Sequence, residues 1–336
     1  MTVLPSAQNG RILISDCTSV PGVVVTDDVE IVGVSNPLWN LCGEPIVVKS
    51  GRLVLRGLRI DQPGQRSAIS ILGGNVRIED CTISGAGRHT IHIVSGQLHT
   101  KNSHFPNSRN RIICVEDGSQ LWATDCTFSS GRVGVYIRGG SVHISNTVFD
   151  NLGSVGVCIK GCGQARLEHV VINQINDAGI LVSDRGSVWA DNLVLTDCGA
   201  ALSFQSTNDS EICNGRIRGC RVGVWIAHGS NPQLVDCQIS AAKTNGAYVA
   251  VGGRGRLSRC TFSDSPVAIC VMNESSSVFT NCRINDDCHI GIIEADQSQC
   301  QFVRMDNNAS PFEIFRPPTP QDPPSSRRLL PVQAKS

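Results

Sequence analysis

The chain has 336 residues, and its 29 Lys and Arg residues balance 29 Asp and Glu residues, so the formal net charge is zero. Since no block of basic residues interrupts this balance, nucleic acid is not expected as a partner, nor is electrostatic attachment to a membrane. The first ten residues lack the basic start and apolar run of a secretory signal, and no run of about 18 apolar residues could cross a bilayer.

Residues 11 to 60 already alternate between apolar and polar side chains. Ile12-Leu13-Ile14 precedes Ser15-Asp16-Cys17, and Val29-Glu30-Ile31 and Leu53-Val54-Leu55 continue the alternation. This pattern predicts the first coils of a repeat, with an entry cap. The excursion Pro37 to Leu41 is expected to fold over an edge or a side.

From residue 80 onward a signature of the form Asp/Asn-Cys-x-Ile/Phe recurs every 21 to 24 residues. Clear or weaker copies begin at Asp80, Asn102, Asp125, Asn146, His169, Asn192, Asn214, Asp236, Arg259 and Asn281. Self-similarity at a fixed period indicates a solenoid, in which each repeat buries its apolar side chains against its neighbours. The pattern therefore predicts one domain over residues 1–310.

Each period contains three short apolar alternations separated by turn residues. In one copy they are residues 120–123, 126–128 and 135–137, followed by Gly139-Gly140. Alternation with period two and glycine punctuation favour strands, and no window shows an apolar stripe at helical spacing. Three strands in about 22 residues predict an all-β fold, a parallel β-helix whose coils lie about 4.8 Å apart.

The signature residues follow from this geometry. Cys and Ile/Phe are two positions apart, so both should point inward, with Cys81, Cys126, Cys237, Cys260 and Cys282 in one internal column. The preceding Asn or Asp is expected at a corner with left-handed backbone angles. Because most of the 16 cysteines follow the repeat, they are interpreted as reduced thiols, which indicates a cytoplasmic protein.

Seven of the 15 prolines follow residue 310, and the run from Arg316 to Pro320 begins a polar stretch. Residues 311–336 are therefore predicted to be a proline-rich disordered tail. Phe312, Ile314 and Phe315 are expected to cap the last coil.

The run from Val20-Pro21-Gly22 to Asp27–Gly33, followed by Asn-Cys-x-Ile and Gly-Val-x-Ile coils, resembles the right-handed, single-stranded parallel β-helix of the pectate-lyase-like superfamily. The nearest likeness is to the carbohydrate-binding and sugar-hydrolase repeats, which also occur in F-box adaptors. This resemblance implies a fold and leaves the function open, because the superfamily includes lyases, hydrolases, epimerases and proteins without a known reaction. The hydrolase motifs have only Ala227-His228-Gly229 and Arg216-Ile217-Arg218 as counterparts, in unmatched context.

One outward column is unusually apolar, and we call it the sheet C stripe. It is predicted to contain Ser70, His92, Cys114, Tyr136, Cys158, Leu181, Ser203, Trp225, Tyr248 and Cys270. Seven of these ten are apolar or aromatic, which favours a docking surface. We expect a non-catalytic binding or scaffold module that recognises a protein or a glycan through Tyr136, Cys158, Leu181, Trp225 and Tyr248. Coverage by the protein's own tail or a side loop is the alternative.

A carbohydrate-active enzyme is the second functional hypothesis. Glu116, Arg138 and Lys160 are predicted on three successive coils beside the stripe. A lyase or hydrolase acting on an acidic polysaccharide could use a cation to bind the carboxylate and a base to take the neighbouring proton. The alternative is that these three residues have no catalytic role and form an exposed ion pair.

No cofactor and no metal site is expected. Four histidines lie between residues 89 and 104, but the period places His92 and His99 on different faces. Trp122 and Trp189 share another outward column. They are expected to pack against crossing loops rather than to serve as ligand platforms.

Overall fold

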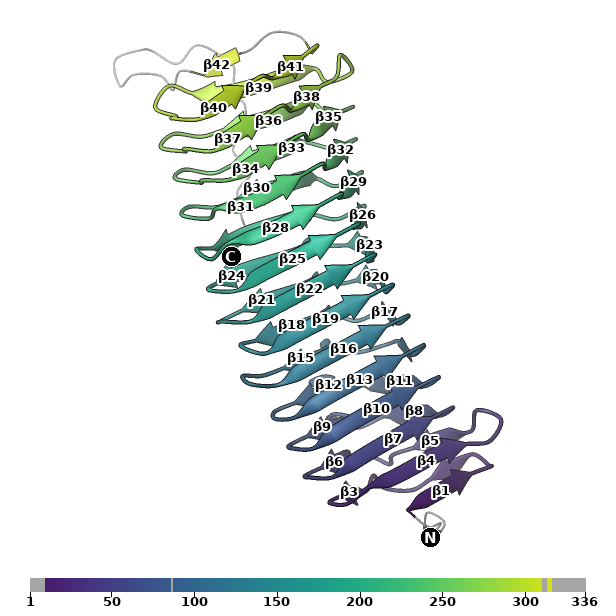
Figure 1. Cartoon of the computed structure of the whole chain (residues 1–336). Helices are drawn as coiled ribbons and strands as arrows, with labels where there is room; N and C mark the ends of the chain where they lie inside the picture. Colours follow the sequence, from purple (N-terminus) through teal and green to yellow (C-terminus); the bar gives the residue numbers. More distant parts are fainter. Residues whose placement is uncertain (1–9, 86, 310–312, 316–336) are drawn as a thin grey trace.

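The computed structural model describes residues 10–85, 87–309 and 313–315. They form a right-handed solenoid of parallel strands, stacked as an elongated column of coils (Figure 1). Each coil contributes one strand to each of three sheets, and each sheet has 14 strands. Within the described ranges, no helix is long and apolar enough to cross a membrane.

Sheet A forms the front of the column in Figure 1. Its strands are β1 (Arg11–Ile14), β4 (Val29–Gly33), β7 (Arg52–Arg56), β10 (Asn75–Glu79), β13 (Gln97–Lys101), β16 (Gln120–Thr124), β19 (Ser141–Ser145), β22 (Gln164–Glu168), β25 (Ser187–Asp191), β28 (Ser210–Cys213), β31 (Pro232–Val235), β34 (Arg256–Ser258), β37 (Val278–Thr280) and β40 (Gln301–Val303).

Sheet B follows the Asn/Asp corner. Its strands are β2 (Thr18–Ser19), β5 (Leu38–Asn40), β8 (Arg59–Gln62), β11 (Thr82–Gly85), β14 (His104–Phe105), β17 (Thr127–Ser129), β20 (Val148–Leu152), β23 (Val171–Ile175), β26 (Val194–Thr196), β29 (Arg216–Arg218), β32 (Gln238–Ser240), β35 (Thr261–Ser263), β38 (Arg283–Ile284) and β41 (Asp306–Asn307).

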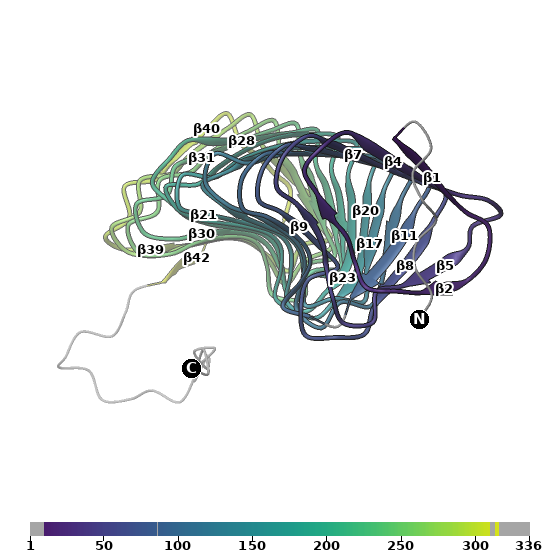
Figure 2. The same cartoon turned by 90° about the horizontal axis from the view of Figure 1, so that it is seen from below.

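Sheet C completes each coil. Its strands are β3 (Val24–Val25), β6 (Ile46–Val48), β9 (Ile69–Ile71), β12 (His89–Ile93), β15 (Arg111–Val115), β18 (Val133–Arg138), β21 (Val155–Lys160), β24 (Ala178–Asp184), β27 (Ala200–Ser206), β30 (Val222–Ile226), β33 (Asn245–Val249), β36 (Val267–Val271), β39 (Ile290–Ala295) and β42 (Glu313–Phe315). Figure 2, viewed along the column, shows a bent cross-section with the outer face of sheet C on its concave side.

The corners between sheets A and B confirm the expected backbone geometry. All ten signature corners have a positive φ, from 46° at Asn102 to 55° at Asp80 and Asp125. Asn and Asp tolerate this left-handed region better than most residues, because their short side chains bond to nearby backbone. His169 and Arg259 adopt it as well. Stacking of successive coils therefore holds the backbone in this conformation even where the Asn or Asp of the signature is replaced.

The interior is a continuous apolar core, as the alternation predicts. The predicted cysteine column is buried: Cys81, Cys126, Cys237, Cys260 and Cys282 are at most 2% exposed. None of the 16 cysteines is paired in a disulfide. Cysteine therefore serves in this column as a small apolar filler behind the corner.

One detail differs from the expectations. The excursion at Pro37 to Leu41 does not fold over an edge, because it contains β5, a regular strand of sheet B. Trp39 is fully buried, and its Nε1 donates a hydrogen bond to the Val20 carbonyl at 3.2 Å. At the other end, β42 pairs with β39 beyond residue 310. The remainder of the predicted tail, residues 311–312 and 316–336, lies outside the described residues, as does residue 310.

Candidate functional site

The sheet C stripe has the register that the period predicts. Each member is the direct neighbour of the next across successive strands, from Ser70 and His92 through Tyr136 and Cys158 to Cys270. The structure therefore brings Tyr136, Cys158, Leu181, Trp225 and Tyr248 into one column on one face.

Much of the stripe is covered by its own neighbours. Four members, Cys114, Cys158, Ser203 and Cys270, are buried. Cys158 packs in a small cluster with Val133, Val155 and Ala178, against which Tyr136 and Leu181 lie half-buried. This cluster arises because sheet C forms the concave side of the cross-section, where outward side chains crowd together (Figure 2). The accessible part of the stripe is thus narrower than its register suggests.

The half-buried rings of the stripe make specific contacts. Trp225 and Tyr248 lie on consecutive coils with ring centroids 4.6 Å apart and planes tilted by 32°. The Arg111 guanidinium covers the Tyr136 ring at 3.7 Å from its centroid. Burial raises the pKa of Tyr248, so its phenol stays protonated at neutral pH.

The predicted charged trio lies beside the stripe. Arg138 and Lys160 are register partners of β18 and β21, and Glu116 follows the end of β15. Arg138 Nη1 and the Glu116 carboxylate are 4.0 Å apart, with two thirds of the Arg138 side chain exposed. At this exposure an ion pair contributes at most about 1 kcal/mol. Glu116 also reaches toward the sheet C stripe, because its Oε1 lies 3.4 Å from His92 Nε2.

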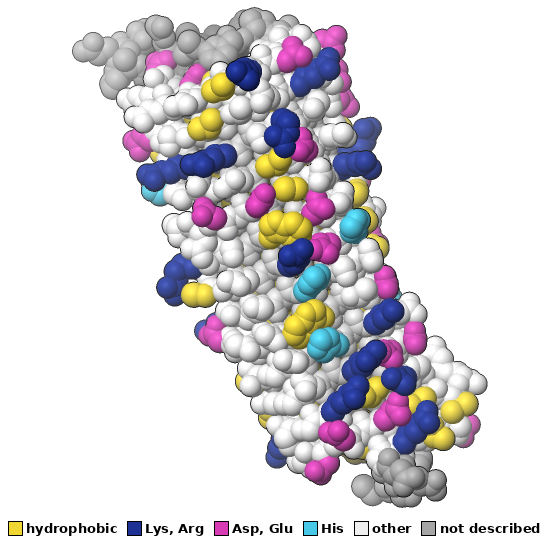
Figure 3. All heavy atoms as spheres, viewed as in Figure 1, with side chains coloured by type: hydrophobic (Ala, Val, Ile, Leu, Met, Phe, Trp, Pro, Cys, Tyr) yellow, Lys and Arg dark blue, Asp and Glu magenta, His cyan; other side chains and the backbone are white. Residues whose placement is uncertain are grey.

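A second surface, on sheet A, was not predicted as a site. It is a column of register partners that we call the sheet A track: His99, Trp122, His143, Arg166, Trp189 and Glu211. Figure 3 shows histidine, hydrophobic and charged side chains in one line along this face. The His99 and Trp122 rings stack at 4.2 Å with planes 2° apart, and Arg166 covers Trp189 at 4.2 Å.

The sheet A track is hollowed. A depression of about 520 Å³ is lined by Trp122, His143, Arg166 and Trp189 together with polar side chains of the adjacent column, including Gln120 and Gln164. A second depression, of about 680 Å³, continues over Arg77, Gln97 and His99. Trp122 lines both, so the two hollows lie next to each other along the column.

The expectation for Trp122 and Trp189 was wrong. Both rings contact side chains of their own column instead of crossing loops. The repeat period already placed them in one outward column, and the neighbouring His99, His143 and Arg166 were readable from the same spacing. What the period did not give was the hollow, which depends on side-chain sizes in two adjacent columns.

The four clustered histidines divide among the three sheets. His89 and His92 lie in sheet C, His99 in sheet A and His104 in sheet B. His92 and His99 therefore do not meet, as predicted. His89 and His92, however, share β12 and lie close to Cys114.

Comparisons with known proteins agree on the fold. A family model described as "right handed beta helix region" matches residues 7–141, 133–265 and 200–310. The solved structure of tailspike protein 3 from bacteriophage CBA120 is similar, with a TM-score of 0.55, 10% identity, and coverage of 96% of this chain and 59% of that chain.

Two further solved structures have similar coverage. They are the Dettilon tailspike protein (TM-score 0.48, 11% identity, 82% of this chain and 62% of that chain) and the periplasmic alginate epimerase AlgG (TM-score 0.47, 11% identity, 90% and 80%). A search of curated proteins found no match. At such identities the likeness concerns the fold, and the chain spans about three fifths of the two tailspike chains.

Proposed function

The chain belongs to the right-handed parallel β-helix proteins, and we propose that it is a non-catalytic module that binds a neutral glycan chain along the sheet A track. The observation that carries this proposal is the hollow of about 520 Å³ with Trp122 and Trp189 in its lining. Sugar rings present apolar C–H faces and a rim of hydroxyl groups. Such a ligand needs aromatic surface next to planar hydrogen-bonding groups.

The side chains of the hollow supply both kinds of contact. Trp122 and Trp189 offer indole surface three coils apart, and Gln120 and Gln164 carry amides that both donate and accept hydrogen bonds. Gln97 and Gln120 already bond to each other at 2.9 Å, which fixes the orientation of these amides along the column. A linear polymer lying along the axis would meet equivalent positions about every 4.8 Å.

Charge and backbone pairing argue against other polymers. Arg166 is tied to Glu168 by a 2.6 Å hydrogen bond, and Glu211 adds a negative charge at one end. A phosphate backbone would need an excess of cations, whereas the lining of the first hollow holds Arg166 against the carboxylates of Asp209 and Glu211. An extended peptide gains affinity by adding a strand to an open edge, but β16 to β28 are each paired on both sides.

The test is a titration of the intact protein with neutral hexaoses (cello-, laminari-, malto-, manno- and xylo-oligosaccharides) by calorimetry and tryptophan fluorescence. The double variant Trp122→Ala/Trp189→Ala should abolish binding. The matched control is Trp225→Ala/Tyr248→Ala on sheet C, which should bind as the wild type does. Melting temperatures identify any variant that fails to fold. Binding of no neutral glycan, or loss of binding in the control alone, would overturn the proposal.

A second candidate is docking of a protein on the sheet C stripe, as the sequence predicts. The Trp225–Tyr248 pair favours it, because adjacent half-buried rings are typical anchors of protein interfaces. Replacing Tyr136, Trp225 and Tyr248 by Ser should then abolish partner capture without lowering the melting temperature. Unchanged capture would refute this candidate.

The lyase alternative at Glu116, Arg138 and Lys160 has less support, because Glu116 already contacts both Arg138 and His92. Incubation with acidic polysaccharides, followed by the absorbance of unsaturated products, tests it directly. For the location we propose the cytoplasm, supported by 16 unpaired thiols.

A further inference from the structure

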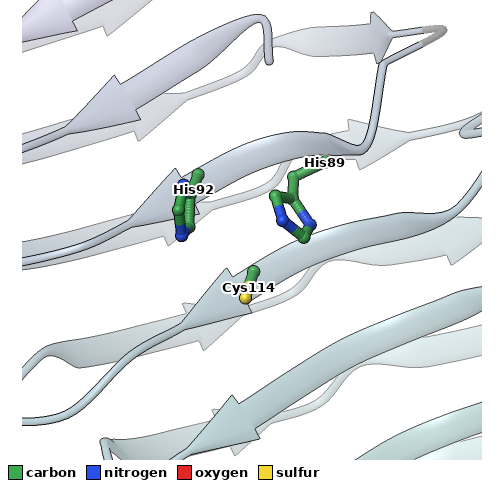
Figure 4. A group of neighbouring side chains, drawn as sticks. All are labelled: His89, His92 and Cys114. Atoms are coloured by element: carbon green, nitrogen blue, oxygen red, sulfur yellow. The ribbon is translucent and has the colours of Figure 1, made fainter. Parts of the chain in front are cut away.

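Two adjacent strands of sheet C bring three metal-binding side chains together. His89 and His92 lie on β12 and Cys114 lies on β15, where it is the register partner of His92. One donor atom from each residue lies within 4.8 Å of the other two. Figure 4 shows the three side chains around one small space between the two strands.

His89 gives an independent indication of a ligand. It is 4% exposed, and its Nδ1 is buried without a hydrogen-bond partner among the described residues. Buried polar atoms in native proteins almost always have a partner, so an unpaired imidazole nitrogen in this space needs an explanation. The His89 and His92 ring centroids are only 4.7 Å apart and their planes are tilted by 39°, and two imidazoles this close can each direct a nitrogen lone pair at one cation.

Glu116 completes the set. Its Oε1 lies 3.4 Å from His92 Nε2 and 3.4 Å from Cys114 Sγ. Two neutral imidazoles, one thiolate and one carboxylate carry two negative charges in total. A divalent cation would neutralise them at a site where Cys114 is fully buried.

We propose that His89, His92 and Cys114 bind a zinc-class divalent metal ion, with the Glu116 carboxylate as the fourth ligand. Nitrogen and sulfur donors select zinc and its transition-metal relatives over calcium and magnesium, which prefer oxygen. Bond lengths of about 2.0–2.1 Å to nitrogen and about 2.3 Å to sulfur require donor separations of roughly 3.3–3.6 Å in a tetrahedron. Side-chain rotations that close the present separations, all within 4.8 Å, by up to about 1.5 Å therefore complete the site.

Burial sets the protonation states of His89 and Cys114 before any metal ion binds. Burial lowers the pKa of His89 to about 3, so its imidazole is neutral and keeps a free lone pair at physiological pH. Burial, followed by the Glu116 charge, raises the pKa of Cys114 to about 12. Metal binding must therefore displace the thiol proton, which leaves Cys114 for the solvent as the metal–sulfur bond forms.

This site is independent of the proposed glycan surface, because it lies on sheet C and the track lies on sheet A. A bound ion would join β12 to β15 beside Tyr136, and thereby tie two successive coils together.

The experiment uses the full chain, dialysed against a chelator and then titrated with Co²⁺ as a spectroscopic substitute for zinc. The wild type should bind one ion per chain and show a thiolate-to-cobalt charge-transfer band in the near ultraviolet. Cys114→Ser should lose the band. Cys158→Ser, a buried cysteine two coils further along the same column, should keep it. A band that persists in Cys114→Ser would overturn the proposal, as would the absence of a band in the wild type.

A second variant tests the metal site without the risk that the protein fails to fold. His92 is partly exposed, with 28% of its side chain accessible, so His92→Ala should leave the fold intact. Losing a residue that merely orients a metal ligand costs about 10- to 100-fold in affinity, so loss of the imidazole itself should cost at least that. Zinc should raise the melting temperature of the wild type but not of His92→Ala. Equal zinc affinities of the two proteins would exclude His92 as a ligand.

Discussion

Phe128 lies against Phe149 of the next coil, with ring centroids 4.8 Å apart and planes 12° apart. Phe105 stacks on the other side of Phe128 at 5.0 Å. All three rings are fully buried, at the Ile/Phe position of the repeat signature. Side chains of the same type therefore stack between coils, and each coil is stabilised by its two neighbours.

Replacing Phe128 by Ala should lower the free energy of unfolding by about 3–5 kcal/mol, because it opens a cavity between two rings that cannot close it. Urea unfolding followed by circular dichroism measures the change. Val148→Ala on the next coil of sheet B is the control, since Val148 is exposed and should cost much less. Equal costs for the two variants would contradict the stacking argument.

Asn146 tests the left-handed corner. Its φ is 48°, and its side chain is exposed. A β-branched residue is strained in this region by roughly 1–2 kcal/mol, whereas Gly adopts it freely. Asn146→Val should therefore lower the free energy of unfolding by about that amount, while Asn146→Gly should change it little. A Val variant as stable as the Gly variant would mean that the corner is not constrained.

The cysteine thiols should divide into a group that reacts rapidly with a disulfide reagent and a group that reacts slowly. Cys17, Cys42 and Cys162 are exposed, whereas burial raises the pKa of Cys81, Cys158 and Cys270 to about 11. Only the thiolate reacts with a disulfide reagent, so the buried thiols should be unreactive at pH 8 both because they are protonated and because they are inaccessible. Counting released chromophore should give a small fast fraction in the native protein and all 16 thiols after unfolding. Rapid modification of most thiols in the native state would contradict the internal column.

The ion pair between Asp236 and Arg259 should make the stability of the folded state slightly more sensitive to acid. Two hydrogen bonds of 2.8 and 2.7 Å from the Arg259 guanidinium hold the pKa of Asp236 below its usual value of 3.8. A carboxyl whose pKa is depressed in the folded state stabilises it above the unfolded pKa, and this contribution is lost as the pH falls through the folded value. Asp236→Asn should therefore narrow the difference in melting temperature between neutral and acidic solution. A wider difference would show that the pair does not act in this way.

The sequence predicted the coil, its three strands and its inward columns because each of these repeats at a fixed period. Cys81, Cys126 and Cys237 show this directly, since their shared place in the signature puts them in one buried column. The prediction failed where a segment lacked the signature. Pro37 to Leu41 looked like an excursion, yet β5 places Trp39 in the core.

The candidate sites were only partly predictable. The register of Tyr136, Trp225 and Tyr248 followed from the period, but the burial of Cys158 beside them did not. Trp122 and Trp189 were placed in one column from the sequence, whereas the hollow that they line depends on the sizes of neighbouring side chains.

The amino-acid sequence by itself determined which residues face inward, where the chain turns and which residues share a column, because a solenoid repeats one local geometry from coil to coil. Only the tertiary structure decided which outward side chains are accessible and which different residue types meet. His89 reaches His92 and Cys114, and sheet C crowds its own stripe, because the bent cross-section and the side-chain rotamers set distances between neighbouring columns. The repeat period of the sequence carries no information about those distances.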